Sequence, residues 1–429
     1  MFQRIKNRTI LAALLFCAPF YLACTEPNPP FGIEGFEKNK TPLEESSKSG
    51  TTEIDSIQTS DSITEGTTKL ISGFDEENVL HTYIWGDESG ELYSGKLYLD
   101  FPSDSFLTKF ELGDIVTVAI VDYDTLEMPV AEASGDVPIA WFVLSATNGS
   151  DKLHLTMHNG YLSEVLGITD VKTPIEVTVS MKEKGGFKFG LEMLNVQYMD
   201  YYTENYPNLS VEEFANFREV RTTGMGKNKL YRSSSPIDNC LGRNLKADSL
   251  AKEAKVATFI NLADSENSAK SFKDFDSSYY ASQNAIFLAL PVEFFSKPFE
   301  QGLAQGFRYM IEHEGPYLVH CTYGMDRTGF TIAILEALMG ATTEEIQADY
   351  AKTFSNYYNV VDGKQIALNE QQVDFFKEVV LRNLKEVYRA EGVNIPDTDN
   401  IDWATATEKY LETFGLTTEE ISALKEKLK

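Results

Sequence analysis

Residues 317–329 read Tyr-Leu-Val-His-Cys-Thr-Tyr-Gly-Met-Asp-Arg-Thr-Gly, and this stretch decides the fold of the second half of the chain. Its first four residues predict a buried strand, and the residues from Thr328 to Met339 predict a helix. Cys321 ends the apolar run, and Arg327 stands just before the expected helix. A strand that turns directly into a helix presents backbone N–H groups and the positive end of the helix dipole at one point. The stretch therefore predicts an anion site in an α/β fold.

The turn between this strand and this helix is typical of a cradle for a phosphate group. Gly324 permits a tight backbone, and the Arg327 guanidinium can bind two phosphate oxygens at once. The same electrostatic field is expected to lower the pKa of Cys321 and make it a thiolate nucleophile at neutral pH. We expect the phosphate to be bound by the turn residues Thr322, Tyr323, Gly324, Met325, Asp326 and Arg327.

Three residues have expected supporting roles around the nucleophile. His320 would orient the turn and stabilise the thiolate. The hydroxyl of Thr328 would hydrogen-bond the sulfur of Cys321 and make it a better leaving group. Cys240 either forms a reversible disulfide with Cys321 in an oxidising compartment or is an inert buried thiol.

The pattern His-Cys-x5-Arg-Thr-Gly over residues 320–329 resembles the loop of the cysteine-dependent protein tyrosine phosphatase superfamily. Its Asp-Arg-Thr-Gly ending is most similar to the bacterial tyrosine phosphatases of the dual-specificity and lipid-phosphatase-like branch. Segments of the chain that also resemble this family are residues 230–236, 258–266 and 339–350. The resemblance extends over residues 205–429. It implies a phosphatase in which Cys321 carries the phosphate as a covalent intermediate, without a metal or an organic cofactor.

The resemblance does not fix the roles of three residues in the flanking segments. Asn261 and Ala263 stand where the family usually has Asp and Arg, so the function of that strand end is not fixed by the resemblance. Arg232, in the segment Leu230 to Pro236, is either a second anion contact or a member of a structural ion pair.

The implied chemistry needs a carboxylic acid that protonates the leaving oxygen and then activates water. Most branches of the family have an Asp for this on a separate loop before the cysteine, but residues 288–295 contain Glu293 and no Asp. In some bacterial relatives an Asp inside the loop, which matches Asp326, is thought to serve instead. We therefore expect Asp326 first and Glu293 second, with Asp264 and Asp274 as further candidates. A residue that only braces the loop is the alternative for Asp326.

Charge and the residue at position 325 bear on the substrate. The chain has 38 Lys plus Arg against 65 Asp plus Glu, a net charge of −27, which excludes a nucleic-acid binder and disfavours polyanionic substrates. Relatives that act on highly anionic lipid head groups usually have Lys where this chain has Met325. We expect phosphotyrosine or another aryl or small monoester, with Tyr323 either stacking on the leaving group or only lining the cleft. An inositol phosphate or phosphoinositide phosphatase is one alternative, and a surface ligand-binding protein with a weak phosphatase domain is another.

The pattern of elements predicts two folded domains. Residues 204–429 predict an α/β phosphatase domain, with a central mixed or parallel sheet flanked by helices. Its expected helices are 211–221, 248–254, 299–313, 328–339, 343–353 and 371–388, with more helix from 405, and its expected strands are 229–232, 256–262, 286–290 and 317–320. Residues 69–203 contain short strand-like runs between turn residues, which predicts a small all-β barrel or sandwich. His154 and His158 lie on and just beyond such a run, so we expect core or surface histidines and no metal site.

The N-terminal residues predict export. Residues 1–23 combine three basic residues with an apolar run, which is typical of a signal peptide. The run ends in Tyr-Leu-Ala-Cys, which resembles a bacterial lipobox and would make Cys24 the lipidated residue. Residues 24–68 are rich in Ser, Thr, Glu, Pro and Gly and predict a disordered stalk. We therefore expect a protein attached to a bacterial membrane only through its lipid, facing the periplasm or the exterior, with a cell-surface ligand for the β-rich domain; an ordinary secretory signal is the alternative.

Overall fold

The computed structural model describes residues 70–86, 95–193, 208–357, 360–361, 364–396 and 400–429. The expected signal peptide, the lipidation site Cys24 and the stalk lie outside these residues. The domain boundary expected after residue 203 lies in the stretch before residue 208 that is not described. Across the described ranges, none of the helices combines the length and the apolar character needed to cross a membrane.

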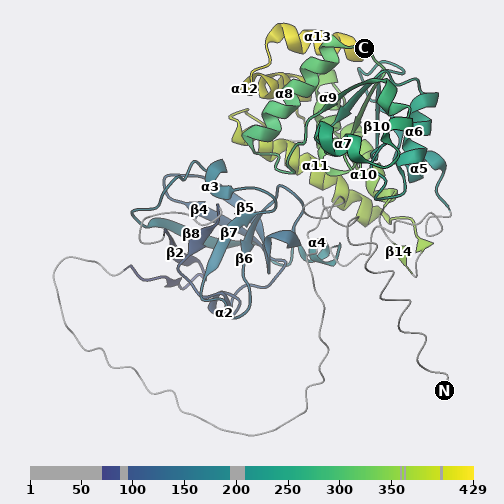
Figure 1. The fold of residues 1–429 in the computed structure, drawn as a ribbon. Helices are drawn as coiled ribbons and strands as arrows, with labels where there is room; N and C mark the ends of the chain where they lie inside the picture. Colours follow the sequence, from purple (N-terminus) through teal and green to yellow (C-terminus); the bar gives the residue numbers. More distant parts are fainter. Residues whose placement is uncertain (1–69, 87–94, 194–207, 358–359, 362–363, 397–399) are drawn as a thin grey trace, which may run out of the picture.

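The first part of the described chain is a β-barrel (Figure 1). Its elements are β1 Gly73–Phe74, β2 Leu80–Trp85, β3 Leu97–Leu99, α2 Ser103–Phe106, β4 Ile115–Ile120, β5 Thr125–Ala131, β6 Phe142–Ser145, β7 Leu153–Met157, α3 Leu162–Val165, β8 Ile175–Glu183 and α4 Lys188–Met193. Among the described residues, seven strands form a ring in the order β2-β3-β7-β6-β5-β4-β8, which closes because β8 also pairs with β2. The neighbours in the ring are antiparallel except for β5 and β6, which run parallel. The expected all-β domain is therefore a barrel, not a sandwich.

The barrel closes around the apolar side chains that alternate along its strands. In β4 the buried residues are Val116, Val118 and Ile120, with the residues between them half-buried. This period of two places one face of every strand toward a common interior. Phe106 and Phe110 belong to that interior and stack with their ring centroids 4.4 Å apart.

The second part is an α/β domain built on a five-stranded sheet in the order β12-β11-β13-β10-β9. Its strands are β9 Arg218–Glu219, β10 Leu230–Ser233, β11 Thr258–Asn261, β12 Asn284–Phe287 and β13 Tyr317–His320. β10, β11, β12 and β13 are parallel, and β9 pairs antiparallel with β10 at the edge. β13 lies between β10 and β11, and all four of its residues are buried, as expected for a strand covered on both faces.

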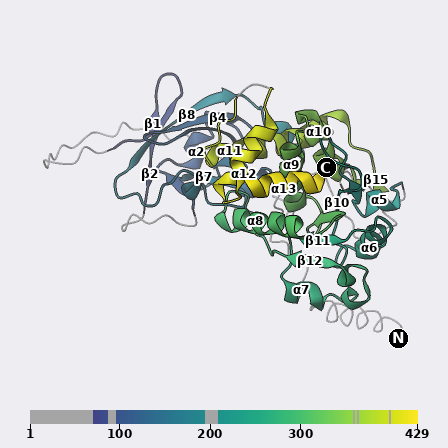
Figure 2. The ribbon, with the colours of Figure 1, turned by 90° about the horizontal axis from the view of Figure 1, so that it is seen from above.

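Helices cover both faces of this sheet (Figures 1 and 2). They are α5 Val211–Phe214, α6 Asn244–Glu253, α7 Glu266–Ser271, α8 Lys297–Glu312, α9 Asp326–Met339, α10 Thr343–Ser355, α11 Glu370–Ala390, α12 Trp403–Thr413 and α13 Thr418–Leu428. Every residue of α9 is buried, because α10, α11, α12 and α13 pack around it. A helix that is apolar on all sides requires such an enclosed position. The start of α9 is thereby fixed relative to the end of β13.

The predicted elements agree with the structure in most of the α/β domain, but the helix expected over residues 211–221 is wrong. α5 ends at Phe214, Asn216 has the left-handed backbone angle φ of +48°, and the chain continues as β9. The Asn216 side chain instead donates a hydrogen bond to the carbonyl oxygen of Gly324, so tertiary contacts override the local helical pattern.

Candidate active site

The candidate nucleophile lies where the central strand passes into the buried helix. Cys321 directly follows β13, and α9 begins five residues later at Asp326. The carboxyl ends of β10, β11, β12 and β13 meet at this edge of the sheet, which is where open α/β sheets bind ligands. Cys321 is 1% exposed, so its side chain is shielded from bulk solvent. We call residues 321–327 the phosphate loop.

The phosphate loop requires glycine at one position. Gly324 has a φ of +68°, and a Cβ atom there would lie 2.1 Å from the carbonyl oxygen of Ser233 on β10. Any side chain would therefore collide with backbone and not with a movable group. The loop lies directly against the end of β10.

Three carbonyl groups of the phosphate loop accept hydrogen bonds from residues that lie outside the loop. Asn216 Nδ2 and Arg232 Nη2 donate to the Gly324 oxygen at 3.1 and 2.9 Å. Tyr357 OH donates to the Tyr323 oxygen at 2.7 Å, and the backbone N–H of residue 235 donates to the oxygen of residue 322 at 3.0 Å. In a trans peptide the C=O and the following N–H point in opposite directions. The N–H groups of residues 323–325 are thus directed inward, which is the arrangement an anion needs.

Arg327 is placed by the segment that follows β12. Its Nη1 donates to the Leu290 carbonyl oxygen at 3.0 Å, and the Leu290 N–H donates in turn to the Leu262 oxygen at 2.8 Å. Arg327 is 5% exposed and stands in the first turn of α9. One arm of its guanidinium is therefore fixed, which orients the remaining donors of the planar group.

Behind the loop lies an ion-pair cluster formed by Arg218, Arg232 and Asp349, of which Arg232 is fully buried and the other two are half-buried. Arg218 Nε donates to Asp349 Oδ1 at 2.6 Å, and Arg232 Nη1 pairs with Asp349 Oδ2. Burial raises the pKa of Asp349, but the positive charges of Arg218 and Arg232 outweigh it and bring the pKa to about 2. Two roles were open for Arg232, an anion contact and a structural ion pair, and in the structure it forms the ion pair. Its side chain is fully buried and holds the phosphate loop through the Gly324 carbonyl oxygen.

His320 is buried and neutral. Its Nε2 lies 3.2 Å from the Tyr280 hydroxyl, and its Nδ1 lies 3.3 Å from the carbonyl oxygen of Cys321. Burial lowers the pKa of His320 to about 3, an effect that the nearby Arg327 strengthens. The ring can therefore orient the backbone at Cys321, but it supplies no positive charge to a thiolate. Such charge comes from Arg327 and from the N-terminus of α9.

Thr328, Met325 and Tyr323 are all buried, but their side chains have different neighbours. The Thr328 side chain is fully buried, and its hydroxyl oxygen has no hydrogen-bond partner among the described residues. Met325 has no exposed surface and belongs to the hydrophobic core of the domain. Tyr323 is also buried and meets the Tyr357 ring edge-on at 6.3 Å. Met325 and Tyr323 thus contribute to the core, and the polar loop surface is backbone.

The candidate acids occupy different positions. Asp326 is 5% exposed at the first residue of α9. Burial raises the pKa of Tyr350 on α10, and the charge of Asp326 adds to this rise. Glu293 is half-buried in the segment 290–296 that also carries Leu290. Asp264 Oδ2 accepts from Asn261 Nδ2 at 3.1 Å at the end of β11. Asp274, half-buried, precedes a short 3₁₀ turn that packs beside β11 and β12.

The other residues that the sequence singled out make hydrogen bonds or packing contacts within the fold. Asn261 Oδ1 accepts from the N–H groups of Ala263 and Asp264, so it caps the end of β11. Cys240 is half-buried, and both it and Cys321 are thiols. In the barrel, His158 Nδ1 lies 2.6 Å from the Val137 oxygen, and the His154 ring lies against Tyr98.

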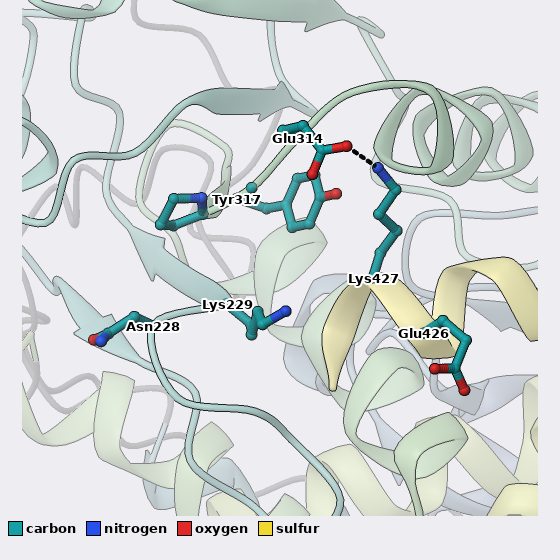
Figure 3. Close-up of a pocket in the computed structure, with 8 residues that line it drawn as sticks. Asn228, Lys229, Glu314, Tyr317, Glu426 and Lys427 are labelled. Atoms are coloured by element: carbon teal, nitrogen blue, oxygen red, sulfur yellow. Dashed lines mark hydrogen bonds and ion pairs between the residues drawn. The ribbon is translucent and has the colours of Figure 1, made fainter.

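A polar hollow lies at the opposite end of β13 (Figure 3). Its volume is about 430 Å³, and Lys229, Tyr317 and Lys427 are among the residues that line it. Figure 3 shows Lys427 directed toward Glu314, and the two form an ion pair of 2.7 Å. Tyr317 begins β13 and Cys321 follows its end, so this hollow is separated from the phosphate loop by the length of the strand.

Several supporting residues were not identified from the sequence. Asn216 and Arg218 are bound to the loop and to the ion-pair cluster, yet they lie far from the loop in sequence. Asp349 belongs to the segment 339–350 that resembles the phosphatase family, and this was the available signal for its importance.

Comparison with known proteins identifies the C-terminal part of the chain. A family model described as the tyrosine phosphatase family matches residues 262–429. No curated protein matches the chain. Among solved structures, an uncharacterized conserved protein from Thermotoga maritima is 21% identical, with 27% of this chain and 40% of that protein covered and a TM-score of 0.22. TpbA of P. aeruginosa is 16% identical, with 37% of this chain and 87% of TpbA covered and a TM-score of 0.21. Residues 262–429, which contain Cys321 and Arg327, belong to the tyrosine phosphatase family of enzymes.

Proposed function

We propose that this protein is a phosphomonoester hydrolase that works through a cysteinyl-phosphate intermediate. The observation that carries the proposal is the placement of Cys321 between the end of β13 and the N-terminus of α9, with the Arg327 guanidinium held by the Leu290 carbonyl. A thiolate, inward N–H groups and a fixed guanidinium together match the needs of a phosphate dianion under attack.

The proposed reaction has two steps. In the first, the Cys321 thiolate attacks phosphorus, the bond from phosphorus to the leaving oxygen breaks, and that oxygen takes a proton from a carboxylic acid. In the second, water attacks phosphorus while the carboxylate accepts a proton from it, and the bond from phosphorus to Cys321 breaks to release phosphate and the thiolate. We assign the carboxylic acid to Asp326 first, because it stands at the loop itself, and to Glu293 second.

The substrate class that we propose is phosphotyrosine in proteins, or another aryl or small monoester. The net charge of −27 supports a singly phosphorylated group over an inositol polyphosphate or a phosphoinositide, because the repulsion grows with the charge of the ligand. The phosphate loop contributes backbone N–H groups and Arg327 to binding, and the side chain at Met325 is apolar and buried.

We also propose that the protein is exported and anchored to a bacterial membrane through Cys24, and that the barrel binds a cell-surface ligand. The composition of residues 1–23 and 24–68 supports export. Labelling with a palmitate analogue tests the anchor: we expect label on the wild type and none on Cys24→Ala. Label that persists on Cys24→Ala would contradict it.

Hydrolysis of p-nitrophenyl phosphate tests the enzymatic proposal. We expect turnover by the wild type and none by Cys321→Ser, whereas equal rates would exclude the cysteine mechanism. A panel of phosphopeptides, inositol phosphates and phosphoinositides then tests the substrate class, with the highest kcat/KM expected for phosphotyrosyl peptides. A binding protein with a weak phosphatase domain would show negligible turnover across the whole panel.

A further inference from the structure

Phe295 connects the two domains beside the phosphate loop. It packs against the core of the barrel and also against a second core, in which Trp141 and Val143 of the barrel join residues of the α/β domain. Its ring lies 5.7 Å from that of Phe142 on β6, with an angle of 40° between the planes. Phe142 is 4% exposed and belongs to the barrel core. The barrel therefore reaches the segment 290–296 through an aromatic pair.

The segment 290–296 is part of the phosphate site. It begins at Leu290, whose carbonyl oxygen accepts from Arg327, and it contains Glu293. Its middle is held from the α/β side, where Phe294 stacks on Phe330 of α9 with centroids 4.4 Å apart. Its other end is Ser296, which caps α8 by accepting from the N–H of Phe299. Phe142 approaches this segment from the barrel side and so completes its enclosure.

The position of Phe142 is fixed by a separate set of contacts between the domains. On α11, the Arg382 guanidinium lies 4.2 Å from the Trp141 ring centroid, and its Nη2 donates to the Glu127 carbonyl oxygen at 2.7 Å. Trp141 directly precedes Phe142 in the chain. Figures 1 and 2 both place α11 at the side of the α/β domain that faces the barrel. A different contact between the domains, made by α4 and not by the segment that carries Phe142, joins Phe189 to Phe375 of α11 at 6.2 Å.

We propose that Phe142 of the barrel is a positioning residue for the phosphate site. Through Phe295 it restrains the segment 290–296, and the segment in turn sets the orientation of Arg327 through the Leu290 carbonyl. The barrel thereby contributes to the geometry of the phosphate site and is not only a binding module attached to the phosphatase. This inference rests on the proposed function, since it assigns Arg327 to phosphate binding.

The test measures phosphate binding and local backbone opening in the full chain. The variants are Phe142→Ala and two controls: Phe110→Ala, which truncates a barrel-core aromatic of the same type away from Phe295, and Phe189→Ala, which weakens the domain contact at α11. The Kd for inorganic phosphate is measured by calorimetry. Hydrogen exchange is followed in the peptide that covers residues 286–299.

We expect Phe142→Ala to raise the Kd for inorganic phosphate about three- to tenfold, the range that loss of one aromatic pair supports, and to speed exchange in the segment 290–296. Phe110→Ala and Phe189→Ala are expected to leave both quantities within about twofold of the wild type. If Phe142→Ala fails to fold, Phe142→Leu retains most of the core volume without the ring and takes its place. Phosphate binding and exchange that match the Phe110→Ala control would overturn the inference.

This experiment is independent of turnover. If the wild type binds phosphate but does not hydrolyse p-nitrophenyl phosphate, the proposed function fails while the effect of Phe142 is still measured. If hydrolysis occurs and Phe142→Ala behaves as the controls do, the proposed function stands and the inference fails.

Discussion

Arg232 donates from Nη2 to the carbonyl oxygen of Gly324 at 2.9 Å, so a fully buried arginine on β10 holds the phosphate loop from behind. The other arm of the same guanidinium pairs with Asp349 on α10. A buried guanidinium without its carboxylate would be strongly unfavourable. The shape of the loop at Gly324 is therefore coupled to an ion pair that lies behind the loop.

The first prediction concerns this ion pair. Asp349→Asn removes the carboxylate that pairs with Arg218 and Arg232. The carboxyl group that remains near them is Glu336, whose pKa burial raises well above its usual range, so we expect the free energy of unfolding to fall by about 3 kcal/mol. Phosphate binding should weaken as well, because Arg232 no longer has a fixed position against Gly324. Chemical denaturation of the variant measures the loss. Asp374→Asn, which removes an exposed ion pair with Lys377, is the matched control and should change stability by less than about 0.5 kcal/mol.

The same carboxyl group gives stability a pH dependence. The pKa of Asp349 is about 2 in the folded protein, against its ordinary value of 3.8. A depressed pKa means that the unfolded chain binds the proton more readily, so the contribution is complete above about pH 4 and declines as the pH falls toward 2. The difference in stability between the wild type and Asp349→Asn should shrink across this window. A difference that stays constant down to pH 2 would contradict the assignment.

The second prediction concerns Gly324. Alanine at this position would place a Cβ atom 2.1 Å from the Ser233 oxygen, so the loop must move, and a shift of this size is expected to reduce kcat/KM at least about 100-fold. Gly340→Ala is the matched control, since Gly340 also has a positive φ, +88°, but a Cβ there meets nothing within 4 Å. It should lower stability by about 1 kcal/mol and leave activity unchanged. Equal activities of the two variants would exclude the steric account of the loop.

The third prediction separates the candidate acids. Asp326→Asn removes the proposed proton donor and should lower kcat at least about 100-fold, whereas Glu293→Gln should lower it only a few-fold. The loss should be greater with phenyl phosphate than with p-nitrophenyl phosphate, because the more basic leaving oxygen depends more on protonation. The two substrates are compared by steady-state kinetics. Full turnover in Asp326→Asn together with its loss in Glu293→Gln would reverse the assignment.

The fourth prediction concerns a carboxyl group outside the site. Glu300 on α8 is fully buried, and burial raises its pKa from 4.5 to about 7, although Lys297 opposes the shift. Here the folded protein binds the proton more readily than the unfolded chain, so the contribution is complete below about pH 4.5 and is lost as the pH rises toward 7.

We therefore expect Glu300→Gln, which resembles the protonated form, to gain stability relative to the wild type between about pH 4.5 and 7. Thermal unfolding across that range measures the difference. Glu266→Gln, at an exposed pair with Lys270, should show no such trend. A difference in stability between Glu300→Gln and the wild type that stays constant over this pH range would contradict the raised pKa of Glu300.

The sequence was sufficient for the parts of the molecule that are encoded locally. The strand Tyr317–His320 was predicted at its observed bounds, because a short apolar run has no competing pattern there. The fold classes of the two domains also followed from periodicity, which left a barrel and a sandwich open for the first, and the family of the C-terminal part followed from the motif around Cys321.

The features of the fold and of the site that the sequence does not reveal depend on contacts between residues that are far apart in the chain. Arg218 and Asp349 are 131 positions apart, and nothing local marks them as partners. The helix expected over residues 211–221 is interrupted at Asn216, because that side chain bonds the carbonyl of Gly324, 108 positions later. Phe142 and Phe295 stand in different domains, so no local pattern could show that their rings meet beside the phosphate site.

The central claim is that Cys321 carries the phosphate during turnover, and trapping that intermediate tests it most directly. The wild type and Asp326→Asn are incubated with p-nitrophenyl phosphate, quenched in acid and analysed by peptide mass spectrometry, with Cys321→Ser as the control. We predict a phosphate adduct on the peptide that contains Cys321, and neither adduct nor turnover in Cys321→Ser. Undiminished hydrolysis by Cys321→Ser, or an adduct on another residue, would contradict the account.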